Sequence, residues 1–564
     1  MIFTNKKIEP SPMTLQAAFD YSLEHYANLP CVSFVEGTPL TYADFGEKVK
    51  EISILLFSLG IQKGDKVALL SHNMPNWVIA YYAIVSNGFI VVPILPDFSR
   101  DEVEAVLLHS ETKAIFVSER LFPRVDGLEL PDMSAIIMID TLMLEKGGIV
   151  QINGEKQYKR AAVKEDDLAA IIYTSGTTGR SKGVMLTHKN LTWSATQSFT
   201  MHEIGTSDTF LSFLPLSHTY ENTIGMIYPI MYGASIYYLE KPPTAAALLP
   251  AMAKIRPTLM LSVPLIMEKL YKSQVQSKFM KSNFTRWIYK NPFFRIIIHF
   301  LAGKKLKASF GGCLKFFGIG GAKLDSRVER FLREAKFPYA IGYGLTETSP
   351  LLAGAGVKDT KLQSTGFALQ GVELRIDNPN KKGVGELWAK GPNVMRGYYK
   401  NPEATVEVLT ADGWFKTGDL ARFGAKNRVY IKGRMKNTII GASGENIYPE
   451  DIESVINNTQ HVIESLVVEE DGFLVAKVLL DLESLEKSIE SWKLSFEDKK
   501  LWIQNFTREL NAKLNRVSQI KRVDVIDEPF EKTASQKIKR FLYTKPQEGL
   551  KKRKEKKTIK VKEQ

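Results

Sequence analysis

Cysteine is nearly absent from this chain of 564 residues, which has only Cys31 and Cys313. Two cysteines cannot form the disulfide framework of a small secreted protein. No segment with a charged, then apolar, then small-residue pattern precedes Met13, so the sequence gives no sign of export. We therefore expect a protein of the reducing cytoplasm.

Long apolar runs are also lacking. The longest, residues 78–95, is interrupted by Asn87, Gly88 and Pro93. These breaks predict a buried helix, a turn and a buried strand in place of a membrane span. Hydrophobic residues nevertheless make up 44% of the chain, which is enough to fill the cores of the two or more domains that a chain of this length requires.

Acidic residues are missing from residues 278–307, which contain eight Lys or Arg. The cations are interleaved with the aromatic residues Phe279, Phe284, Trp287, Tyr289, Phe293, Phe294 and Phe300. An interfacial segment needs rings that enter the acyl region and cations that meet lipid headgroups. The segment predicts either peripheral contact with an anionic membrane, on its inner face, or a helical hairpin packed on the protein's own surface.

Positive charge is concentrated at the C-terminus. Residues 545–564 hold nine Lys or Arg against three Glu, which gives +6 of the formal net charge of +13. A solvated, disordered tail is the simplest interpretation, and contact with anionic lipid or nucleic acid is the alternative. No recognition fold or stacking motif accompanies the tail, so we expect no nucleic-acid partner.

Residues 171–188, IIYTSGTTGRSKGVMLTH, run from an apolar strand-like entry into hydroxyl and glycine residues and then Lys182. Such a loop can cradle a phosphate, because glycines let the backbone approach an anion, hydroxyls donate hydrogen bonds and the lysine adds a point charge. The spacing is not that of a Walker loop, which needs glycine at position 181. On its own, the stretch is equally compatible with an ordinary turn.

Seven further segments make the phosphate interpretation specific. They are FLPLSHTYE at 213–221, VPLIMEKLY at 263–271, FFGIGGAKLD at 316–325, YGLTETSP at 343–350, GWFKTGDLARF at 413–423, VYIKGRMKNTIIGASGENIYPEDIE at 429–453 and KTASQKIKR at 532–540. Together with 171–188, and in the same order, they resemble the signatures of the adenylate-forming superfamily of AMP-forming enzymes. The segments at 213–221 and 263–271 are most similar to its long-chain fatty acyl-CoA synthetase branch.

Hydrophobic periodicity predicts an α/β fold. Helical stretches such as 42–59 and 326–335 alternate with strand-like runs at 67–70, 90–94, 114–117, 136–139, 170–173, 236–239, 259–262 and 314–319. This alternation predicts parallel sheets covered by helices, followed by a small β subdomain over 371–429. We expect an N-terminal domain over 1–435, a mobile α+β C-terminal domain over 436–544 with helices at 449–457 and 499–515, and a tail over 545–564.

The resemblance implies a two-step reaction. ATP and a fatty acid would form an acyl adenylate and pyrophosphate with the help of Mg²⁺, and the thiol of coenzyme A would then displace AMP. The chain would be an AMP-forming long-chain fatty acid–CoA ligase. A fatty acyl-AMP ligase or acyl-carrier-protein synthetase is the alternative enzyme, and a silent acyl-binding or membrane-scaffold protein is the non-enzyme alternative. Whether the protein forms a homodimer is left open.

The resemblance also assigns the ATP site to glycine-rich turns. Its phosphate loop comprises Thr174, Ser175, Gly176, Thr177, Thr178, Gly179 and Lys182. The adenine pocket is lined by Gly320, Gly321 and Ala322, Tyr343 stacks on the base, and Gly344 is a further nucleotide-binding residue. Thr346 would donate to the α-phosphate, and Glu347 would coordinate Mg²⁺ together with Thr174, as suits a hard cation.

Roles in the second half of the chain follow in the same way. Asp419 matches the carboxylate that accepts hydrogen bonds from the ribose hydroxyls, and Arg434 matches its companion. Lys436 matches the hinge about which the C-terminal domain turns, and Gly444 lies in a loop that borders the coenzyme A tunnel. Without these neighbouring motifs, Lys436 would be interpreted as an ordinary exposed lysine.

Lys537 matches the lysine on which adenylation depends, because its cation bridges the carboxylate and the α-phosphate. Its context is Ser-Gln-Lys-Ile, where Gln536 replaces the usual glycine. His218 matches the histidine near the junction of the acyl and pantetheine tunnels. Its ring either senses the carbonyl region or fills the wall, and Glu221 is expected to hold it.

Overall fold

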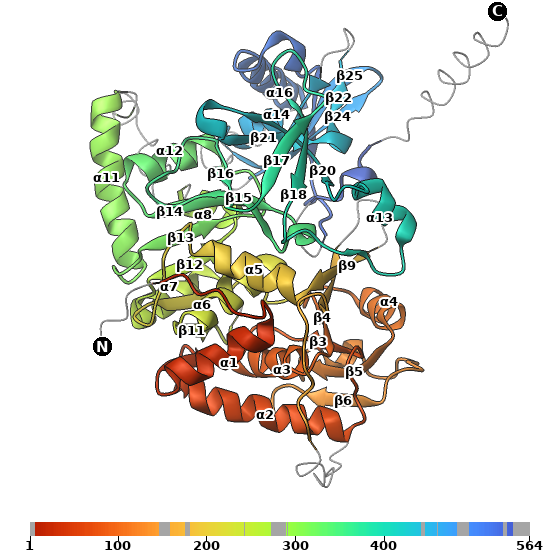
Figure 1. Cartoon of the computed structure of the whole chain (residues 1–564). Helices are drawn as coiled ribbons and strands as arrows, with labels where there is room; N and C mark the ends of the chain where they lie inside the picture. Colours follow the sequence, from red (N-terminus) through yellow and green to blue (C-terminus); the bar gives the residue numbers. More distant parts are fainter. Residues whose placement is uncertain are drawn as a thin grey trace, which may run out of the picture. The chain divides into compact units, whose positions relative to one another are not determined.

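The computed structural model of the chain (Figure 1) describes residues 6–145, 158–174, 181–241, 243–271, 289, 291–441, 446–459, 461–481, 496–533 and 538–544. Two compact units can be distinguished. The larger holds Met1–Thr174, Ser181–Thr417 and Ala421–Ile431, and the smaller holds Gly418–Leu420 and the chain from Lys432 onward. The smaller unit therefore begins four residues before position 436, where the sequence predicts the start of a C-terminal domain.

The larger unit contains an eight-stranded sheet. Its strands, in spatial order, are β19 (Gly397–Tyr398), β9 (Lys182–Thr187), β8 (Leu168–Thr174), β4 (Ile90–Ile94), β3 (Lys66–Leu70), β5 (Thr112–Val117), β6 (Ala135–Met138) and β7 (Met143–Leu144). The five strands from β8 to β6 run parallel, and helices α3 (Pro75–Val85) and α4 (Arg100–Ser110) connect three of them. The interrupted apolar run thus forms a buried helix, a turn and a buried strand, as predicted.

A nine-stranded sheet completes the α/β arrangement. Its strands, in spatial order, are β16 (Phe367–Ala368), β15 (Leu351–Ala355), β14 (Tyr339–Gly344), β13 (Phe316–Ile319), β12 (Leu259–Ser262), β10 (Thr209–Ser212), β11 (Ser235–Tyr238), β1 (Pro30–Phe34) and β2 (Leu40–Thr41). The strands from β14 to β1 are parallel, which confirms the predicted α/β class. Between β13 and β14, the Asp325 carboxylate caps α12 (Ser326–Glu334).

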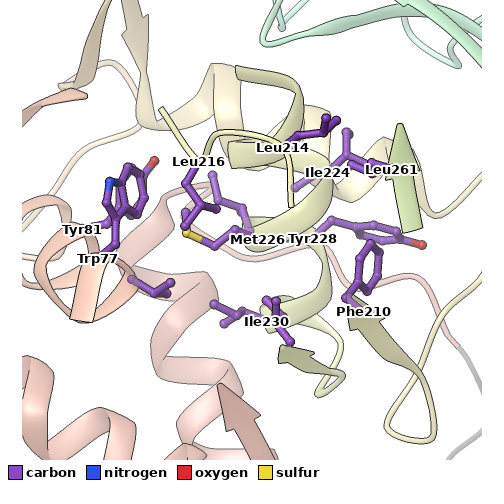
Figure 2. Close-up of a cluster of buried hydrophobic side chains, with 14 of the residues drawn as sticks. Trp77, Tyr81, Phe210, Leu214, Leu216, Ile224, Met226, Tyr228, Ile230 and Leu261 are labelled. Carbon is purple, nitrogen blue, oxygen red and sulfur yellow. The ribbon is translucent and has the colours of Figure 1, made fainter. Parts of the chain in front are cut away.

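Several large side chains from helices pack in the core of the larger unit. Trp77 and Tyr81 come from α3, and Ile224 and Tyr228 come from the π-helical turn Glu221–Ile227 and from α6 (Tyr228–Met231). Figure 2 shows these residues with Phe210 and other members of the same buried cluster. A π-helical turn places one extra residue in the turn and is often found at functional sites.

The remaining elements are smaller. A four-stranded sheet joins β17 (Glu373–Asp377), β18 (Gly385–Lys390), β20 (Phe415–Phe423) and β21 (Val429–Arg434), as the crowded turn signals predicted. The smaller unit contains α14 (Pro449–Asn457), β24 (Val462–Glu470), β25 (Phe473–Leu480), α16 (Phe496–Asn511) and β26 (Arg522–Ile526). Helix α16 ends four residues before the predicted position, because the Asn511 side chain bonds the backbone N–H and C=O of Ile520 at 2.7 and 2.8 Å. In the part of the chain that the structure describes, no helix is long and apolar enough to cross a membrane.

Candidate functional site

The ends of the predicted phosphate loop lie on adjacent strands. In the β8–β9 hairpin Thr174 is directly opposite Lys182, and the Thr174 hydroxyl lies 3.5 Å from the Lys182 carbonyl oxygen. Antiparallel pairing therefore returns the chain to its starting point, as a loop that encloses an anion requires. Ser175, Gly176, Thr177, Thr178 and Gly179 lie outside the described residues.

The predicted adenine segment follows β13. Gly321 has φ +84°, a left-handed conformation that favours glycine, and a Cβ on Gly320 would lie 3.1 Å from the ring of Tyr220. Ala322 is exposed. Because β13 pairs in parallel with β14, Ile319 lies opposite Ile341, so this segment and Tyr343 emerge from neighbouring strands at the same edge of the sheet.

Thr346 and Glu347 begin a short 3₁₀ turn after β14. The turn is fixed by the Thr348 hydroxyl, which accepts from the Leu345 N–H at 3.0 Å. The Glu347 carbonyl oxygen accepts from the Met395 N–H at 2.9 Å. The side chain of Glu347 is half-buried, and its Oε1 accepts a hydrogen bond from the Tyr398 hydroxyl at 2.9 Å.

Tyr398 connects two parts of the predicted ATP site. Its ring centroid lies 4.8 Å from the Lys182 ammonium, and its hydroxyl holds Glu347. The structure thus brings the end of the phosphate hairpin and the predicted Mg²⁺ ligand to the same side chain. Sequence reasoning missed Tyr398, because nothing local distinguishes it from a buried strand tyrosine. The pairing of β19 with β9, more than 200 positions earlier in the chain, brings Tyr398 next to the predicted ATP site.

The predicted metal ligands suit a cation that keeps most of its coordinated water molecules. The described residues contain no group of three or more His, Cys, Asp or Glu side chains that could enclose a metal ion. If Glu347 and Thr174 were the protein ligands, one carboxylate and one hydroxyl would leave the other ligand positions to water and phosphate oxygens, as is usual for Mg²⁺. The residues therefore fit a magnesium ion that arrives with a nucleotide.

An apolar cavity follows one face of the nine-stranded sheet. Alternate residues of three neighbouring strands line it, as one sheet face requires: Leu259 and Leu261, Phe316 and Gly318, Ala340 and Gly342. Phe210, in register with Leu259 on the neighbouring strand β10, also lines the cavity, as do Ile224 and Tyr228 of the helical segment, and Figure 2 shows these three with Leu261. Its free volume is about 40 Å³, space for about three water molecules. An alkyl chain can enter only if lining side chains move.

His218 and Glu221 lie at the start of the π-helical turn. The His218 Nδ1 accepts a hydrogen bond from the Tyr220 N–H at 3.3 Å. The expectation that Glu221 holds the His218 ring is wrong. Glu221 is fully buried, and its Oε1 instead accepts from the Ser212 hydroxyl at 2.5 Å. Gly225 makes room for the carboxyl group, since a Cβ there would lie 2.7 Å from it.

We expect the variant Glu221→Gln to be more stable than the natural protein at neutral pH. Burial raises the pKa of Glu221 from 4.5 to about 8, against a smaller opposing effect of the Ser212 hydrogen bond. An acid whose folded-state pKa is raised loses stabilising free energy as pH increases from 4.5 to 8, because only the unfolded state then ionises freely. Glutamine should therefore raise the free energy of unfolding by about 3 kcal/mol at pH 7.

Denaturant unfolding at pH 5, 7 and 8.5 checks this pH dependence. The difference between Glu221→Gln and the natural protein should be small at pH 5 and increase toward pH 8.5. Glu403→Gln, in the exposed first turn of α13 (Pro402–Val408), is the matched control and should change little at any pH. A difference that is independent of pH would contradict a buried, neutral carboxyl group.

The smaller unit contains the predicted ribose residues. Asp419 is buried, and its Oδ1 lies 2.8 Å from the Nε of Arg434, whose side chain remains 44% exposed. The structure therefore brings the two predicted ribose residues together as an ion pair. Lys436 is exposed in the 3₁₀ turn Met435–Asn437. Gly444 and Lys537 lie outside the described residues.

Comparisons with known proteins identify the family. A family model described as AMP-binding enzyme matches residues 19–399. The chain belongs to this family. It is 30% identical over 489 residues to the long-chain-fatty-acid–CoA ligase FadD15 of Mycobacterium tuberculosis, covering 81% of this chain and 79% of that protein. It is 27% identical over 597 residues to the chloroplastic long-chain-fatty-acid–[acyl-carrier-protein] ligase AEE15 of Arabidopsis thaliana, covering 87% and 78%.

A solved structure extends the similarity to the fold. The ATP-bound crystal structure of MatB from Rhodopseudomonas palustris superposes with a TM-score of 0.77 at 23% identity, and the match covers 95% of this chain and 99% of that one. The α/β fold of this chain is therefore shared with that protein over almost its whole length.

Proposed function

We propose that this chain is an AMP-forming long-chain fatty acid–CoA ligase. The observation that carries the proposal is the adjacency of the apolar cavity to the predicted adenylate segments. Gly318 and Gly342 line the cavity, and their strands continue directly into Gly320 and Tyr343. An acyl chain in the cavity would present its carboxyl group at these turns. The similarity to FadD15 supports a fatty acid as the substrate.

The proposed reaction concentrates negative charge, and the residues offset it. The fatty-acid carboxylate attacks the α-phosphate of ATP, the bond between the α- and β-phosphates breaks, and pyrophosphate leaves the acyl adenylate. Thr346 would donate a hydrogen bond to the α-phosphate, and Lys182 would be the cation for the polyphosphate. Glu347 and Thr174 would hold Mg²⁺, which neutralises phosphate charge when bound. Asp419 would accept hydrogen bonds from the ribose hydroxyls. Coenzyme A then receives the acyl group through a new thioester bond, and AMP leaves.

The acyl acceptor is the point that sequence identity leaves undecided, since FadD15 and AEE15 are named for different acceptors. A series of fatty acids of increasing length, assayed for pyrophosphate release and for thioester formation with coenzyme A or with a holo acyl carrier protein, tests the proposal. We expect thioester with coenzyme A and a preference for long chains. Pyrophosphate release without any thioester would indicate an acyl-AMP ligase, and absence of release with every fatty acid would overturn the proposal.

We also propose a cytoplasmic protein that contacts the inner membrane face through α11 (Pro292–Ser309). His299, Gly303 and Leu306 form the buried side of this helix. A Cβ on Gly303 would lie 2.5 Å from that of Ala335, so α11 lies close against the end of α12 (Figure 1). Six large apolar side chains are 43–68% exposed: Phe293, Phe294, Ile296, Ile297, Phe300 and Leu301.

Charge complementarity favours an anionic lipid surface as the partner of α11. Exposed Lys304 and Lys305 follow the apolar turns, and no acidic residue occurs within the helix. Arg295 is neutralised by Glu334 at 2.9 Å, whereas the Lys336 ammonium lies 5.8 Å from the centroid of the exposed Phe300 ring. Cations at the border of exposed rings suit headgroups above an acyl region.

The double variant Phe293→Ser, Leu301→Ser should bind vesicles about a hundredfold more weakly, because two large side chains lose their burial in lipid. The double variant Lys304→Glu, Lys305→Glu should weaken the salt-sensitive part of the binding free energy to vesicles by about 1 kcal/mol per cation lost. Removal of residues 545–564 should weaken it in the same way. Cosedimentation with phosphatidylserine–phosphatidylcholine vesicles at low and high salt measures both effects.

Val406→Ser is the control for the membrane experiment, since Val406 is 74% exposed on α13 and should not affect vesicle binding. Natural protein that stays in the supernatant at low salt would contradict the membrane proposal. If the variant of Phe293 and Leu301 instead dissociated a dimer in analytical ultracentrifugation, α11 would be a subunit contact.

A further inference from the structure

Three backbone hydrogen bonds fix the segment that carries Tyr398. The Arg396 and Tyr399 N–H groups donate to the Met185 and Gly183 carbonyl oxygens of β9 at 3.0 and 2.8 Å. The Met395 N–H donates to the Glu347 carbonyl oxygen at 2.9 Å. The segment 395–399 is therefore tied both to the strand that begins with Lys182 and to the turn that carries Glu347.

The Tyr398 side chain makes the same connection a second time. It is buried, its hydroxyl donates to Glu347 Oε1 at 2.9 Å, and its ring face lies 4.8 Å from the Lys182 ammonium. Its own N–H donates to the Thr405 hydroxyl at 2.9 Å, which fixes the backbone from the other side. A rigid ring thus sets the separation between one anionic and one cationic group.

We infer that Tyr398 is a positioning residue for the nucleotide's polyphosphate and its metal ion, an inference that rests on the proposed function. A hydrogen bond to one carboxylate oxygen fixes the rotation of the carboxyl plane and leaves Oε2 for a cation. The electron-rich ring face holds the lysine ammonium by a cation–π interaction without neutralising its charge. Both groups are thereby held in place before the nucleotide binds.

The variant Tyr398→Phe separates the two contacts, because it keeps the ring and removes the hydroxyl. We expect its affinity for Mg²⁺ with a non-hydrolysable ATP analogue to fall about tenfold in calorimetric titration. Affinity for AMP, which lacks the β- and γ-phosphates, should be unchanged. The Mg²⁺ concentration for half-maximal pyrophosphate release should increase about tenfold as well, with kcat at saturating Mg²⁺ nearly constant.

Tyr399→Phe is the matched control. The Tyr399 hydroxyl, on the next residue, donates to Glu111 Oε2 at 3.3 Å, outside the predicted ATP site, so its loss should leave both affinities unchanged. A double variant with Glu347→Gln should bind the magnesium analogue no more weakly than Glu347→Gln alone, because the hydroxyl acts through that carboxylate.

Equal weakening of AMP and of the magnesium analogue in Tyr398→Phe would overturn the inference, since it would indicate a general structural role. Unchanged Mg²⁺ dependence would overturn it as well. Failure of the proposed function has a different signature, because the natural protein would then release no pyrophosphate with any fatty acid. Tyr398→Leu is a second test. Because it also removes the ring that holds the Lys182 ammonium, it should raise the KM for ATP as well.

Discussion

Gly344→Ala is expected to reduce kcat/KM for ATP by at least about a hundredfold. A Cβ on Gly344 would lie 1.7 Å from the Pro350 carbonyl oxygen and 3.0 Å from the Leu351 Cα. All atoms in the way belong to the backbone, so no side-chain rotation can relieve the clash. Strand β14 must move away from β15, and Tyr343, Thr346 and Glu347 move with it. Displacement of catalytic groups by about 1 Å costs about a hundredfold in rate.

The segment opposite Gly344, which contains Pro350 and Leu351, is held in place by hydrogen bonds and cannot shift easily. The Asn393 amide donates to the carbonyl oxygens of Thr348 and Leu351 at 3.0 and 2.7 Å, and the Thr348 hydroxyl donates to that of Pro350 at 2.7 Å. Steady-state kinetics with ATP, together with thermal unfolding, measures the effect. Unchanged kcat/KM would show that the turn does not hold the nucleotide.

A second glycine variant separates steric from conformational effects. Gly312 has φ +77°, and a Cβ there would meet no atom within 4 Å. Gly312→Ala should therefore lose about 1 kcal/mol of stability from backbone strain alone and keep its kinetics. If both alanine variants lost activity to the same degree, general destabilisation and not displacement of the ATP turn would be responsible.

Much of the fold could be predicted from the sequence because it follows from local patterns. The strand-like runs at 67–70, 90–94 and 259–262 correspond to β3, β4 and β12. Parallel strands in these sheets are buried on both faces and read as short continuous apolar runs. Boundaries that depend on tertiary hydrogen bonds were less accurate, as the early end of α16 at Asn511 shows.

Contacts between distant segments could not be predicted. Tyr398 reaches Glu347 and Lys182 only through the pairing of β19 with β9, and that pairing has no local signature. The partner of Glu221 was missed for the same reason. Motif reasoning pairs a carboxylate with the nearest histidine in the sequence, whereas the π-helical turn directs Glu221 toward Ser212 on β10.

The proposed chemistry assigns Lys537 a role in only one half-reaction. Carboxylate attack on the α-phosphate brings two anions together, and a cation that bridges them lowers the barrier without giving up a proton. Thioester formation from an existing acyl adenylate does not bring these anions together. Lys537 follows the predicted hinge position Lys436 in the sequence, so its contribution is expected to end when the hinge turns.

Lys537→Ala should therefore slow acyl-adenylate formation by about a thousandfold and change the conversion of supplied acyl adenylate and coenzyme A to thioester by about twofold at most. Rapid-quench measurement of each half-reaction distinguishes the two rates. Lys539→Ala is the matched control: it lies two residues further on, and its ammonium is 3.4 Å from Glu531 Oε2, so adenylation should remain near the natural rate. Equal loss in both half-reactions of Lys537→Ala would place the lysine elsewhere in the reaction and contradict a hinge that separates the two steps.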